Sequence, residues 1–593
     1  MGFWKTFLAC LLAIVTGSVV SFFFTIFVIA GMISSLSFFA ENDYTVESQS
    51  ILMIDTSEPI VETASGSLAD NFDFQNFKIK SSTTIYSAVA MIDAAAEDPR
   101  IAGIYIRISP VMATSLSSLY ELRAALERFR KNSVDKFIVA YGDTYSQGAL
   151  YLASVADKIY LNPAGAVDWR GMGSTSMFFK GTLDKLGVEP EIIRHGTFKG
   201  AVEPFMLDKM SDANRLQMQT MITSMWDHIV SQIALSRSVS ADSLKAMASD
   251  LRIVTATNAV EAGLVDSTIY RDQLQTNLER LTSRKTLKLL TLNEYRRSGV
   301  NLAGDVASEN KIAVVYASGD IVDSGDPASQ IVGNDLAASI AKVRKDKTVK
   351  AMVLRVNSPG GSALASEVVR REMELTKKEK PVIVSMGEYA ASGGYWISAT
   401  SDAIVTTPVT ITGSIGVFGL MFNVEKGARE KLGVTFDGVT TNPSADMGAI
   451  YRPLTRAERL VIQNGVDTVY MNFVNNVAAG RKMKAADVDS LAGGRVWSGL
   501  QAVDNGLANK IGGLNDAIAL AAEKAGLDKY RITTVSGSLD GNFVQMFQNF
   551  SHASLRWIFG NNSSVSTVAI ELQKLMKEQG VKAAMEQKVI LDF

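Results

Sequence analysis

A strand-turn-helix motif occurs twice in this chain, and the two copies differ where a reactive side chain would be placed. The copies span residues 137–163 and 382–408, and matched positions are always 245 residues apart. Gln147 occupies the turn of the first copy, and Ser392 has the same place in the second. Similarity over this length indicates that a whole structural unit has been duplicated. Because only the second copy carries a hydroxyl at the turn, we expect the copies to contribute different groups to one divided active site.

The duplication continues on both sides of this motif. Matching segments are 57–62 with 318–323, 101–107 with 349–355, 186–188 with 432–434, and 252–263 with 495–506. Each copy alternates short β-branched runs with helical stretches, which predicts an α/β fold with largely parallel strands. The runs 312–316 and 352–356 are typical of strands buried on both faces. Residues 211–237 carry apolar side chains at helical spacing, and Thr455 with Glu458 forms a capping-box pattern before another helix.

The length of the chain requires more than one hydrophobic core, since 593 residues exceed what a single core usually supports. We therefore expect an N-terminal anchor (1–40), a first repeat (41–300), a second repeat (301–535) and a C-terminal extension (536–593). The extension is less periodic and contains a predicted helix at 565–579. The sequence assigns no role to it.

The N-terminal segment is predicted to be an uncleaved transmembrane helix. No charged residue occurs in 6–40, and about 20 apolar residues cross the hydrocarbon core of a bilayer. The segment lacks a clear small-residue cleavage site near its end. Lys5 precedes it, whereas Glu41, Asp43 and Glu47 follow it. The positive-inside rule then places the bulk of the chain outside the cytoplasm.

Composition excludes several kinds of function. The 59 basic and 61 acidic residues create no basic field, which argues against nucleic acid as a partner. The only cysteine is Cys10, within the predicted anchor. The exported part therefore has no disulfides and no thiolate nucleophile. Nothing in the sequence calls for a metal or an organic cofactor.

Ser392 is a candidate nucleophile, because it follows a buried strand and precedes Gly393-Gly394. A helix starting there directs its free amides and positive dipole end toward the serine, the environment that a tetrahedral oxyanion needs. A second glycine-rich loop contains Gly360 and Gly361, and the first copy lacks both glycines at 108–111. The first copy has thus lost the serine and this loop together. The alternative is a packing turn of small residues, which gives no reason for that paired loss.

A serine nucleophile needs a base, and the sequence leaves several candidates. His228 lies in a periodic amphipathic helix, His552 has no companion in the extension, and His195 lies close to Lys199. A lysine serves as the base in Ser-Lys variants of the catalytic triad. Burial lowers the ordinary lysine pKa of about 10.4 toward the working range. Spacing alone does not select Lys199.

Two segments, 389–398 and 198–205, resemble the S49 serine protease family in its long tandem form, signal peptide peptidase A. The resemblance implies that Ser392 is the nucleophile, that Lys199 is the general base and that Ser414 orients the lysine. It also implies that Gly393 donates an oxyanion amide, together with Gly360 or Gly361. Glu203 is interpreted as a structural residue rather than a second base.

The same resemblance carries expectations about the whole protein. It implies two crotonase/ClpP-like repeats, a homotetramer, and anchorage by one span in the bacterial inner membrane with the catalytic part on the extracytoplasmic side. It also implies that the substrates are peptides, chiefly remnants of cleaved signal peptides. Two other functions stay open: an acyl-CoA enzyme of the crotonase class, and a catalytically silent membrane scaffold.

Overall fold

The computed structural model describes residues 44–63, 82–110 and 114–535, and also residues 2, 16–17, 72–73, 78–79, 112, 580–584 and 591–592. Within these residues, no helix has both the length and the apolar character needed to span a bilayer. Apart from residues 2 and 16–17, the predicted anchor (1–40) lies outside the described residues. The helix predicted at 565–579 also lies outside them.

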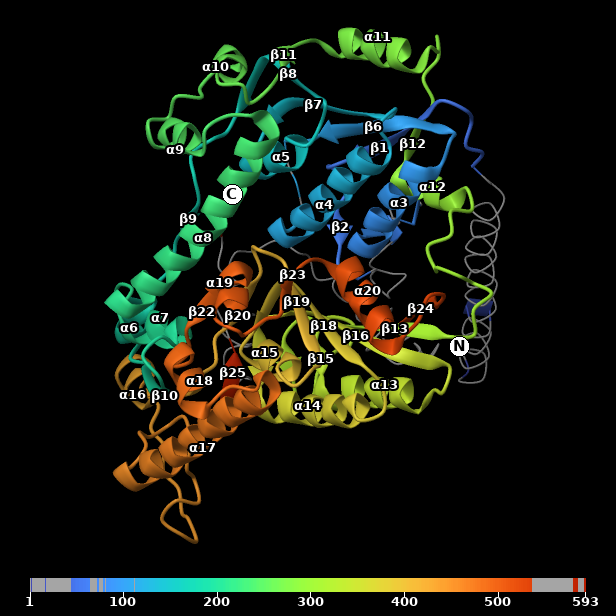
Figure 1. The fold of residues 1–593 in the computed structure, drawn as a ribbon. Coiled ribbons are helices and arrows are strands. Elements are labelled where there is room, and N and C mark those ends of the chain that lie inside the picture. The colour runs from blue at the N-terminus through green and yellow to red at the C-terminus, as the bar shows by residue number, and fades with distance from the viewer. Residues whose placement is uncertain are drawn as a thin grey trace.

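The first repeat is built on six parallel strands in the order β11-β8-β7-β6-β1-β12 (Figure 1). Its strands are β1 (Ser50–Asp55), β6 (Ile101–Ile108), β7 (Phe137–Tyr145), β8 (Lys158–Val167), β11 (Ser267–Thr268) and β12 (Leu289–Thr291). Its helices are α3 (Ile85–Glu97), α4 (Leu116–Asn132), α5 (Gln147–Ala153), α8 (Asp212–Arg237), α9 (Ala241–Ser249), α10 (Ala256–Glu261), α11 (Arg271–Thr282) and α12 (Leu292–Arg297). Helices α3, α4, α5 and α8 bury their apolar sides in the large core on one face of the sheet, while α11 covers the other.

The second repeat is built on an eight-stranded sheet, in which only β22 is antiparallel to its neighbour. Its strands are β13 (Lys311–Ser318), β16 (Val349–Ser358), β18 (Val382–Ala391), β19 (Ala403–Thr406), β20 (Ile411–Gly413), β22 (Val496–Ser498), β23 (Lys510–Ile511) and β24 (Arg531–Val535). Its helices are α13 (Gly333–Lys345), α14 (Ala363–Lys377), α15 (Gly393–Ser398), α17 (Arg456–Arg481), α18 (Ala485–Leu491), α19 (Gly499–Asp504) and α20 (Leu514–Ala525). Cores lie on both faces of this sheet. The strands predicted at 312–316 and 352–356 are confirmed within β13 and β16.

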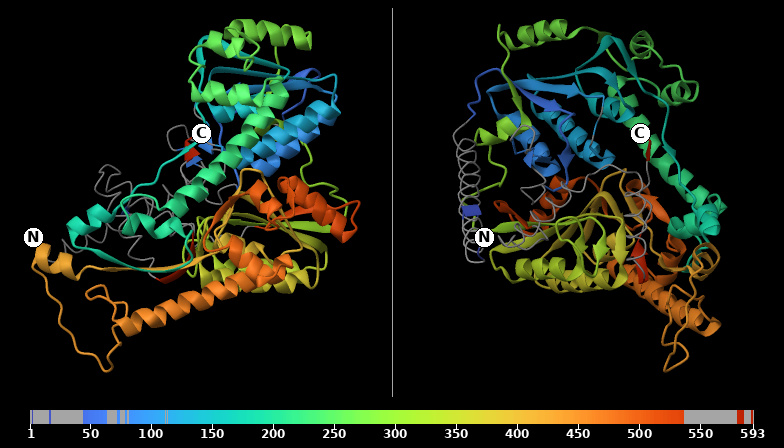
Figure 2. Two further views of the ribbon diagram at one scale, coloured as in Figure 1. Left: turned by 60° about the vertical axis from the view of Figure 1, so that its left-hand side comes forward. Right: turned by 180° about the vertical axis from the view of Figure 1, so that it is seen from behind.

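A third sheet joins the two repeats, in the order β10-β21-β25-β17-β14-β15. It contains β10 (Glu189–His195), β14 (Ile321–Val322), β15 (Ile331–Val332), β17 (Gly360–Ser362), β21 (Val417–Asn423) and β25 (Gly580–Ala584). All seven residues of β10 pair antiparallel with β21. The first repeat therefore extends a strand onto the second, as the views in Figure 2 show from the side and from behind.

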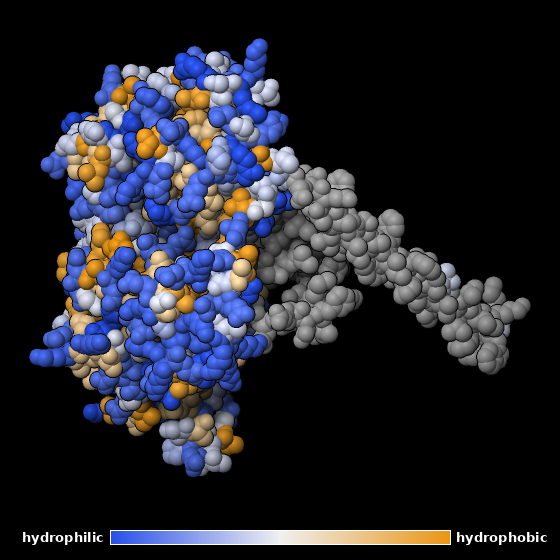
Figure 3. Space-filling model, turned by 45° about the vertical axis from the view of Figure 1, so that its right-hand side comes forward, coloured by the Kyte–Doolittle hydropathy of each residue, from blue (hydrophilic) through white to orange (hydrophobic). Residues whose placement is uncertain are grey.

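Short elements complete the described chain. They are β2 (Ile60–Val61), β3 (Phe72–Asp73), β4 (Lys78–Ile79), β5 (Thr83–Thr84), β9 (Gly173–Ser174), α6 (Lys180–Leu186), η1 (Gly200–Val202), α7 (Glu203–Met206), α16 (Glu425–Leu432) and β26 (Leu591–Asp592). The face drawn in Figure 3 is mainly hydrophilic, with hydrophobic residues in small groups.

The long helices α8 and α17 start as the sequence predicts. Ser211 caps α8 by accepting the amide of Asn214. Thr455 accepts the amide of Glu458, whose carboxylate accepts the amide of Thr455 at 2.9 Å, so the capping box is confirmed. Because these side chains satisfy amides that have no partner within the helix, both starts are fixed locally.

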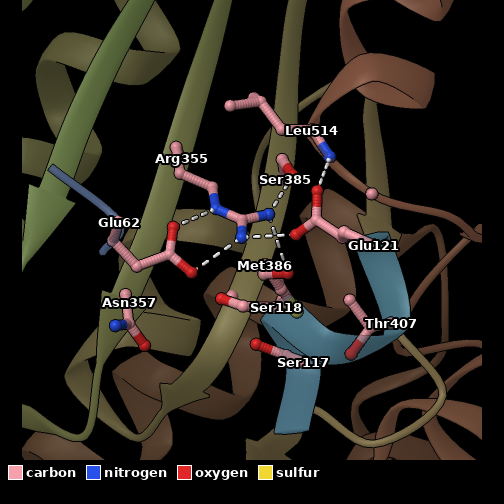
Figure 4. Close-up of polar contacts among 12 residues, drawn as sticks. Glu62, Ser117, Ser118, Glu121, Arg355, Asn357, Ser385, Met386, Thr407 and Leu514 are labelled. Carbon is pink, nitrogen blue, oxygen red and sulfur yellow. Dashed lines mark hydrogen bonds and ion pairs between the residues drawn. The ribbon is translucent and has the colours of Figure 1, made fainter. Parts of the chain in front are cut away.

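A buried ion network fastens the repeats together (Figure 4). Arg355 on β16 donates through Nη2 to Glu62 Oε1 at 2.8 Å and to Glu121 Oε1 at 2.6 Å, and both glutamates belong to the first repeat. The Arg355 side chain is only 1% exposed. Glu121 Oε2 also accepts the amide of Leu514 at 2.7 Å. Burial raises the pKa of the Glu121 carboxyl, while the nearby guanidinium opposes that rise.

A polar cavity also lies between the repeats. Its lining includes Tyr120, Arg123, Tyr151 and His228 from the first repeat and Leu500 from the second. The His228 ring lies 3.4 Å from the Tyr151 hydroxyl through Nε2. Burial, assisted by the positive charge of Arg123, lowers the pKa of His228 to about 4. These contacts give His228 a packing role on α8.

The lowered pKa of His228 predicts a loss of stability in mild acid. In the unfolded chain this group takes up a proton near pH 6.5, whereas in the folded protein it does so only near pH 4. The contribution of His228 to the free energy of unfolding is therefore complete above pH 6.5 and is lost as the pH falls through about 4. This loss is at most about 3 kcal/mol. Between pH 7 and pH 4.5, the fall in Tm should be smaller for His228→Gln than for the wild type. An identical fall in the two proteins would contradict the assignment.

Candidate active site

Three predicted site residues from the two repeats meet in one buried cluster. Lys199 Nζ lies 2.9 Å from Ser392 Oγ, 3.1 Å from Ser414 Oγ and 3.2 Å from the Ser414 carbonyl oxygen. Their exposed fractions are 1% for Lys199, 0% for Ser392 and 2% for Ser414. The contact joins residues 193 positions apart in sequence within a single chain.

The turn at Ser392 is strained in the way that a strand-to-helix elbow requires. Ser392 follows β18 and has φ 56° and ψ −115°, a region that L-residues rarely occupy. Its amide donates to the Gly413 carbonyl at 2.8 Å. Gly394 has no room for a side chain, because a Cβ there would lie 2.6 Å from the Ser358 carbonyl oxygen. The small residues after Ser392 therefore let the loop before β17 pack against the start of α15.

Gln147 shows what replaced the serine in the first repeat. Its Nε2 donates to the Gly171 carbonyl at 2.9 Å, and its Oε1 accepts the amides of Arg170 and Gly171. The side chain is 3% exposed. These bonds satisfy the amide group of Gln147 and close the corresponding turn, so this position serves structure rather than reactivity.

The Lys199 loop is held against the second repeat by backbone packing. Phe198 donates its amide to the Gly493 carbonyl at 2.9 Å. A Cβ on Gly494 would lie 2.6 Å from Lys199 Cα, and one on Gly196 would lie 2.4 Å from Gly493 O. Close approach of the two loops therefore depends on glycine. The sequence prediction missed Gly493 and Gly494, although the first repeat has Asp250-Leu251 at the corresponding place.

An apolar side chain also borders the lysine amine. Lys199 Nζ lies 6.0 Å from the centre of the Phe418 ring on β21. A Cβ on Gly416 would lie 3.2 Å from Lys199 Cδ, so the stem of the lysine is closely packed. The lysine side chain is therefore tightly enclosed from its stem to its amine.

The predicted oxyanion glycines lie beside the serine turn. Gly393 is the first residue of α15, where the amides have no partner within the helix. Gly361, with φ 151°, must be glycine because a Cβ would lie 1.9 Å from the Ile321 carbonyl oxygen. The Gly360 amide donates to Ser358 Oγ at 3.2 Å. Helix α15 contacts β17, so the Gly393 amide and the amides of Gly360 and Gly361 are neighbours. The roles of these amides as oxyanion donors stay predictions.

Glu203 and Gln217 support the site from the first repeat. Glu203 is fully buried and accepts from Ser211 Oγ at 2.5 Å and Asn214 Nδ2 at 2.9 Å, contacts that suit the structural role predicted for it. Gln217 is 3% exposed and donates to the Phe198 carbonyl at 2.9 Å. Its Oε1 accepts the amide of Val496 at 3.1 Å. Gln217 therefore ties the Lys199 loop to the second repeat, and the sequence prediction did not identify it.

The remaining candidates lie apart from the cluster. His195 pairs with Asp467 at 2.7 Å through Nδ1 and stacks on Tyr470. His228 lines the polar cavity, and His552 lies outside the described residues. Within the described part of the chain, no group of His, Cys, Asp and Glu side chains could hold a metal ion.

Comparison with known proteins agrees with this architecture. The model of peptidase family S49 matches residues 130–285 and again 374–528. Protease 4 of Haemophilus influenzae is 37% identical over 509 residues, 84% of this chain and 79% of that protein. Protease 4 of Salmonella typhi is 36% identical over 460 residues, 76% of this chain and 73% of that protein. A putative signal peptide peptidase SppA of Enterococcus faecium is 40% identical over 295 residues, 48% of this chain and 78% of that protein.

A solved structure also aligns with part of the chain. It is a ClpP1 mutant from Listeria monocytogenes, 14% identical, covering 35% of this chain and 94% of its own, with a TM-score of 0.24. A score this low carries no argument about the fold.

The tandem match and the full-length relatives define this α/β protein as a serine protease. The chain belongs to peptidase family S49, with two copies of the family domain in tandem.

Gln217 provides a test of how the two repeats are aligned for this activity. Gln217→Leu removes the side-chain bonds to the Phe198 carbonyl and to the Val496 amide and loosens the Lys199 loop. We expect kcat for a peptide substrate to fall by about 10- to 100-fold, because small displacements of catalytic groups have effects of this size. KM should change little. Gln219→Leu, an exposed position on the same helix, should leave kcat unchanged; equal rates in both variants would show that Gln217 does not position the site.

Proposed function

We propose that this chain is a membrane-anchored serine endopeptidase that uses a Ser392–Lys199 dyad to degrade cleaved signal peptides and other apolar peptides. The observation that carries the proposal is the buried 2.9 Å contact between Lys199 Nζ and Ser392 Oγ. A hydroxyl and an amine at this distance, shielded from water, form the arrangement of a nucleophile and its base.

In the proposed mechanism, Ser392 Oγ attacks the carbonyl carbon of the scissile peptide bond while the neutral amine of Lys199 takes the hydroxyl proton. The ammonium then gives this proton to the leaving amine, and an acyl-enzyme remains on Ser392. Lys199 next takes a proton from water, which attacks the ester carbonyl carbon. The bond between this carbon and Ser392 Oγ then breaks, the ammonium returns the proton to Oγ, and the acyl group leaves as a carboxylic acid. Lys199 therefore acts first as base and then as acid in each half of the reaction.

Two groups of neighbours are assigned supporting roles in this proposal. Ser414 orients the amine through its hydroxyl and its carbonyl oxygen, both within 3.2 Å of Nζ. Gly393 donates an amide to the oxyanion, and Gly360 or Gly361 donates the second. The role of Gly393 follows from the free amides at the start of α15. For Gly360 to take part, its amide must exchange its contact with Ser358 for one with the substrate.

The apolar segment 6–40 supports anchorage in the bacterial inner membrane, with the protease domains on the extracytoplasmic side. Signal peptide remnants are released at that membrane, and the name of the Enterococcus faecium relative points to the same substrates. We further propose that the active form is a homotetramer of crotonase/ClpP-like repeats. The segment 433–455 projects from the body of the protein (Figure 2) and exposes Val434, Phe436 and Val439, which supports contact with another subunit.

A fluorophosphonate probe tests the nucleophile. The wild type should be labelled on Ser392 and should hydrolyse a synthetic signal peptide, and Ser392→Ala should lose both properties. Ser401→Ala, another buried serine in the second repeat, should keep both. Turnover by Ser392→Ala would refute the mechanism, while absence of label and turnover in the wild type would favour an acyl-CoA enzyme or a silent scaffold.

A further inference from the structure

One segment, residues 493–495, is bonded both to the loop of Lys199 and to the turn of Ser414. Its first carbonyl, that of Gly493, accepts the amide of the residue before Lys199 at 2.9 Å. Its last carbonyl, that of Arg495, accepts the Ser414 amide at 2.7 Å. Because both contacts come from one short piece of main chain, the position of this segment determines how the lysine loop and the serine turn face each other.

The turn at Ser414 needs this support because its backbone is left-handed. Ser414 has φ 49°, and Gly413 before it has φ 76°. A serine occupies this region only at a cost in conformational energy. The turn brings the hydroxyl and the carbonyl oxygen of Ser414 within 3.1 Å and 3.2 Å of Lys199 Nζ. Since the Arg495 carbonyl holds the Ser414 amide, a shift of Arg495 would move both oxygens relative to the amine.

The side chain of Arg495 lies between two aromatic rings. Its Cζ lies 5.2 Å from the centre of the Phe198 ring and 4.1 Å from the centre of the Trp497 ring on β22. Its Nε is buried and has no hydrogen-bond acceptor within the described part of the chain. Burial lowers the pKa of this guanidinium. The attraction between a planar cation and two ring faces therefore joins the residue next to Lys199 to strand β22.

The matching arginine of the first repeat has a different environment. Arg252 corresponds to Arg495 in the duplicated sequence. Its side chain is 60% exposed and pairs with Asp250, two residues before it. The same backbone position therefore carries an arginine enclosed between rings in the repeat that holds Ser392, and an exposed arginine in the repeat that holds Gln147. This difference connects the enclosed arginine with the site and not with the fold that both repeats share.

We propose that Arg495 is a positioning residue for the reaction, which keeps Ser414 and Lys199 in register. Its guanidinium joins the ring on the lysine loop to the ring on β22, while its carbonyl holds the serine turn. This inference rests on the proposed function, because it assigns Arg495 to the geometry of the proposed lysine base. Arg495 acts through these two residues and not on the substrate. Displacements of catalytic groups by about 1 Å are enough to lower a rate by two orders of magnitude.

Steady-state kinetics of the full-length protein tests the role of the cation. Arg495→Met removes the charge and keeps an unbranched side chain, and kcat for a fluorogenic peptide should fall by about 10- to 100-fold with little change in KM. Rates are expressed per reactive Ser392, counted with the fluorophosphonate probe, so that misfolded molecules do not contribute. A purely structural role would lower the number of reactive sites and leave kcat per site unchanged, and that result would overturn the proposal.

Two further variants serve as controls for this measurement. Arg495→Lys keeps a cation beside the rings, and its kcat should be at least about threefold higher than that of Arg495→Met. Arg252→Met removes the exposed arginine at the matching position and should keep the wild-type kcat. An equal loss in the methionine and lysine variants of Arg495 would show that the positive charge is not what holds the loop.

The second ring provides a test that does not depend on a single variant. Trp497→Leu removes one face of the stack and should lower kcat as Arg495→Met does, whereas Trp497→Phe keeps a ring and should lower it less. Because both changes break the same stack, the double variant of Arg495→Met with Trp497→Leu should be within about twofold of the slower single variant. Fully additive losses would refute the stack as the positioning device.

Hydrogen exchange, followed by mass spectrometry, separates this inference from the proposed function. In Arg495→Met, the amides of Phe198 and Ser414 should exchange at least about fivefold faster than in the wild type, because the segment that holds their acceptors is loosened. The amide of Met352, which donates to the Pro381 carbonyl in the same repeat, should be unchanged. Unchanged exchange at Phe198 and Ser414 would contradict the proposal. If the wild type hydrolyses no peptide, the proposed function fails, while the exchange rates still decide whether Arg495 holds the two loops.

Discussion

Lys199→Arg is expected to lower kcat/KM for peptide hydrolysis by at least about 1,000-fold while the protein stays folded. Arginine keeps the positive charge, but its guanidinium does not release a proton near neutral pH, so the base is lost. Loss of a proton-transfer group that acts with a nucleophile commonly has an effect of this size. The rate is measured with a fluorogenic peptide, and a thermal melt checks the fold.

Two variants make this result interpretable. Lys199→Met removes the amine but keeps a side chain of similar length, and it should be equally inactive. Because methionine is no bulkier than lysine, this result would show that activity is lost with the base and not through crowding by the guanidinium. Lys380→Met is the matched control, because Lys380 is also buried but donates to the carbonyls of Val343, Asp346 and Val349. This control should lose stability and keep its activity per folded molecule. Retention of a tenth of the wild-type rate by Lys199→Arg would show that another group is the base.

Arg355→Met is expected to destabilise the protein by about 3–5 kcal/mol, the usual effect of breaking a buried ion pair by removing one partner. The variant leaves Glu62 and Glu121 close together between the repeats without a positive charge. Urea denaturation followed by fluorescence measures the change in the free energy of unfolding.

The duplicated architecture supplies the control for this experiment. Arg107 occupies the matching position in the first repeat, but its side chain is 48% exposed and pairs with Asp55 at 3.2 Å. Arg107→Met should cost less than about 1 kcal/mol, as expected for exposed ion pairs. Similar losses in the two variants would mean that the buried network does not hold the repeats together.

The elements that the sequence predicts well are those determined by local patterns. The parallel strands appear as apolar runs, the cap at Thr455 as a capping-box pattern, and the elbow at Ser392 as small residues after a strand. Each depends on neighbours in the chain. For this reason the duplication and the turn at Ser392 can be read from the sequence.

The proposed base and its supports depend on contacts between distant segments, which no local pattern encodes. Apart from the family resemblance of 198–205, Lys199 is distinguished only because β10 crosses to β21 and brings its amine to a serine 193 residues away. Gln217 resembles any polar residue of an amphipathic helix until its two partners are known. In sequence, Gly493 and Gly494 resemble an ordinary turn, and their role depends on the backbone of the opposite loop.

The pairing of β10 with β21 also determines when, during synthesis, the proposed active site can form. During synthesis the amine is made first, and it has nothing to activate until the later half has emerged and folded around it. A product of interrupted translation that ends before Ser392 therefore carries the proposed base without the proposed nucleophile. In the proposed mechanism both halves are needed for hydrolysis, so the divided site acts as a safeguard against premature proteolysis.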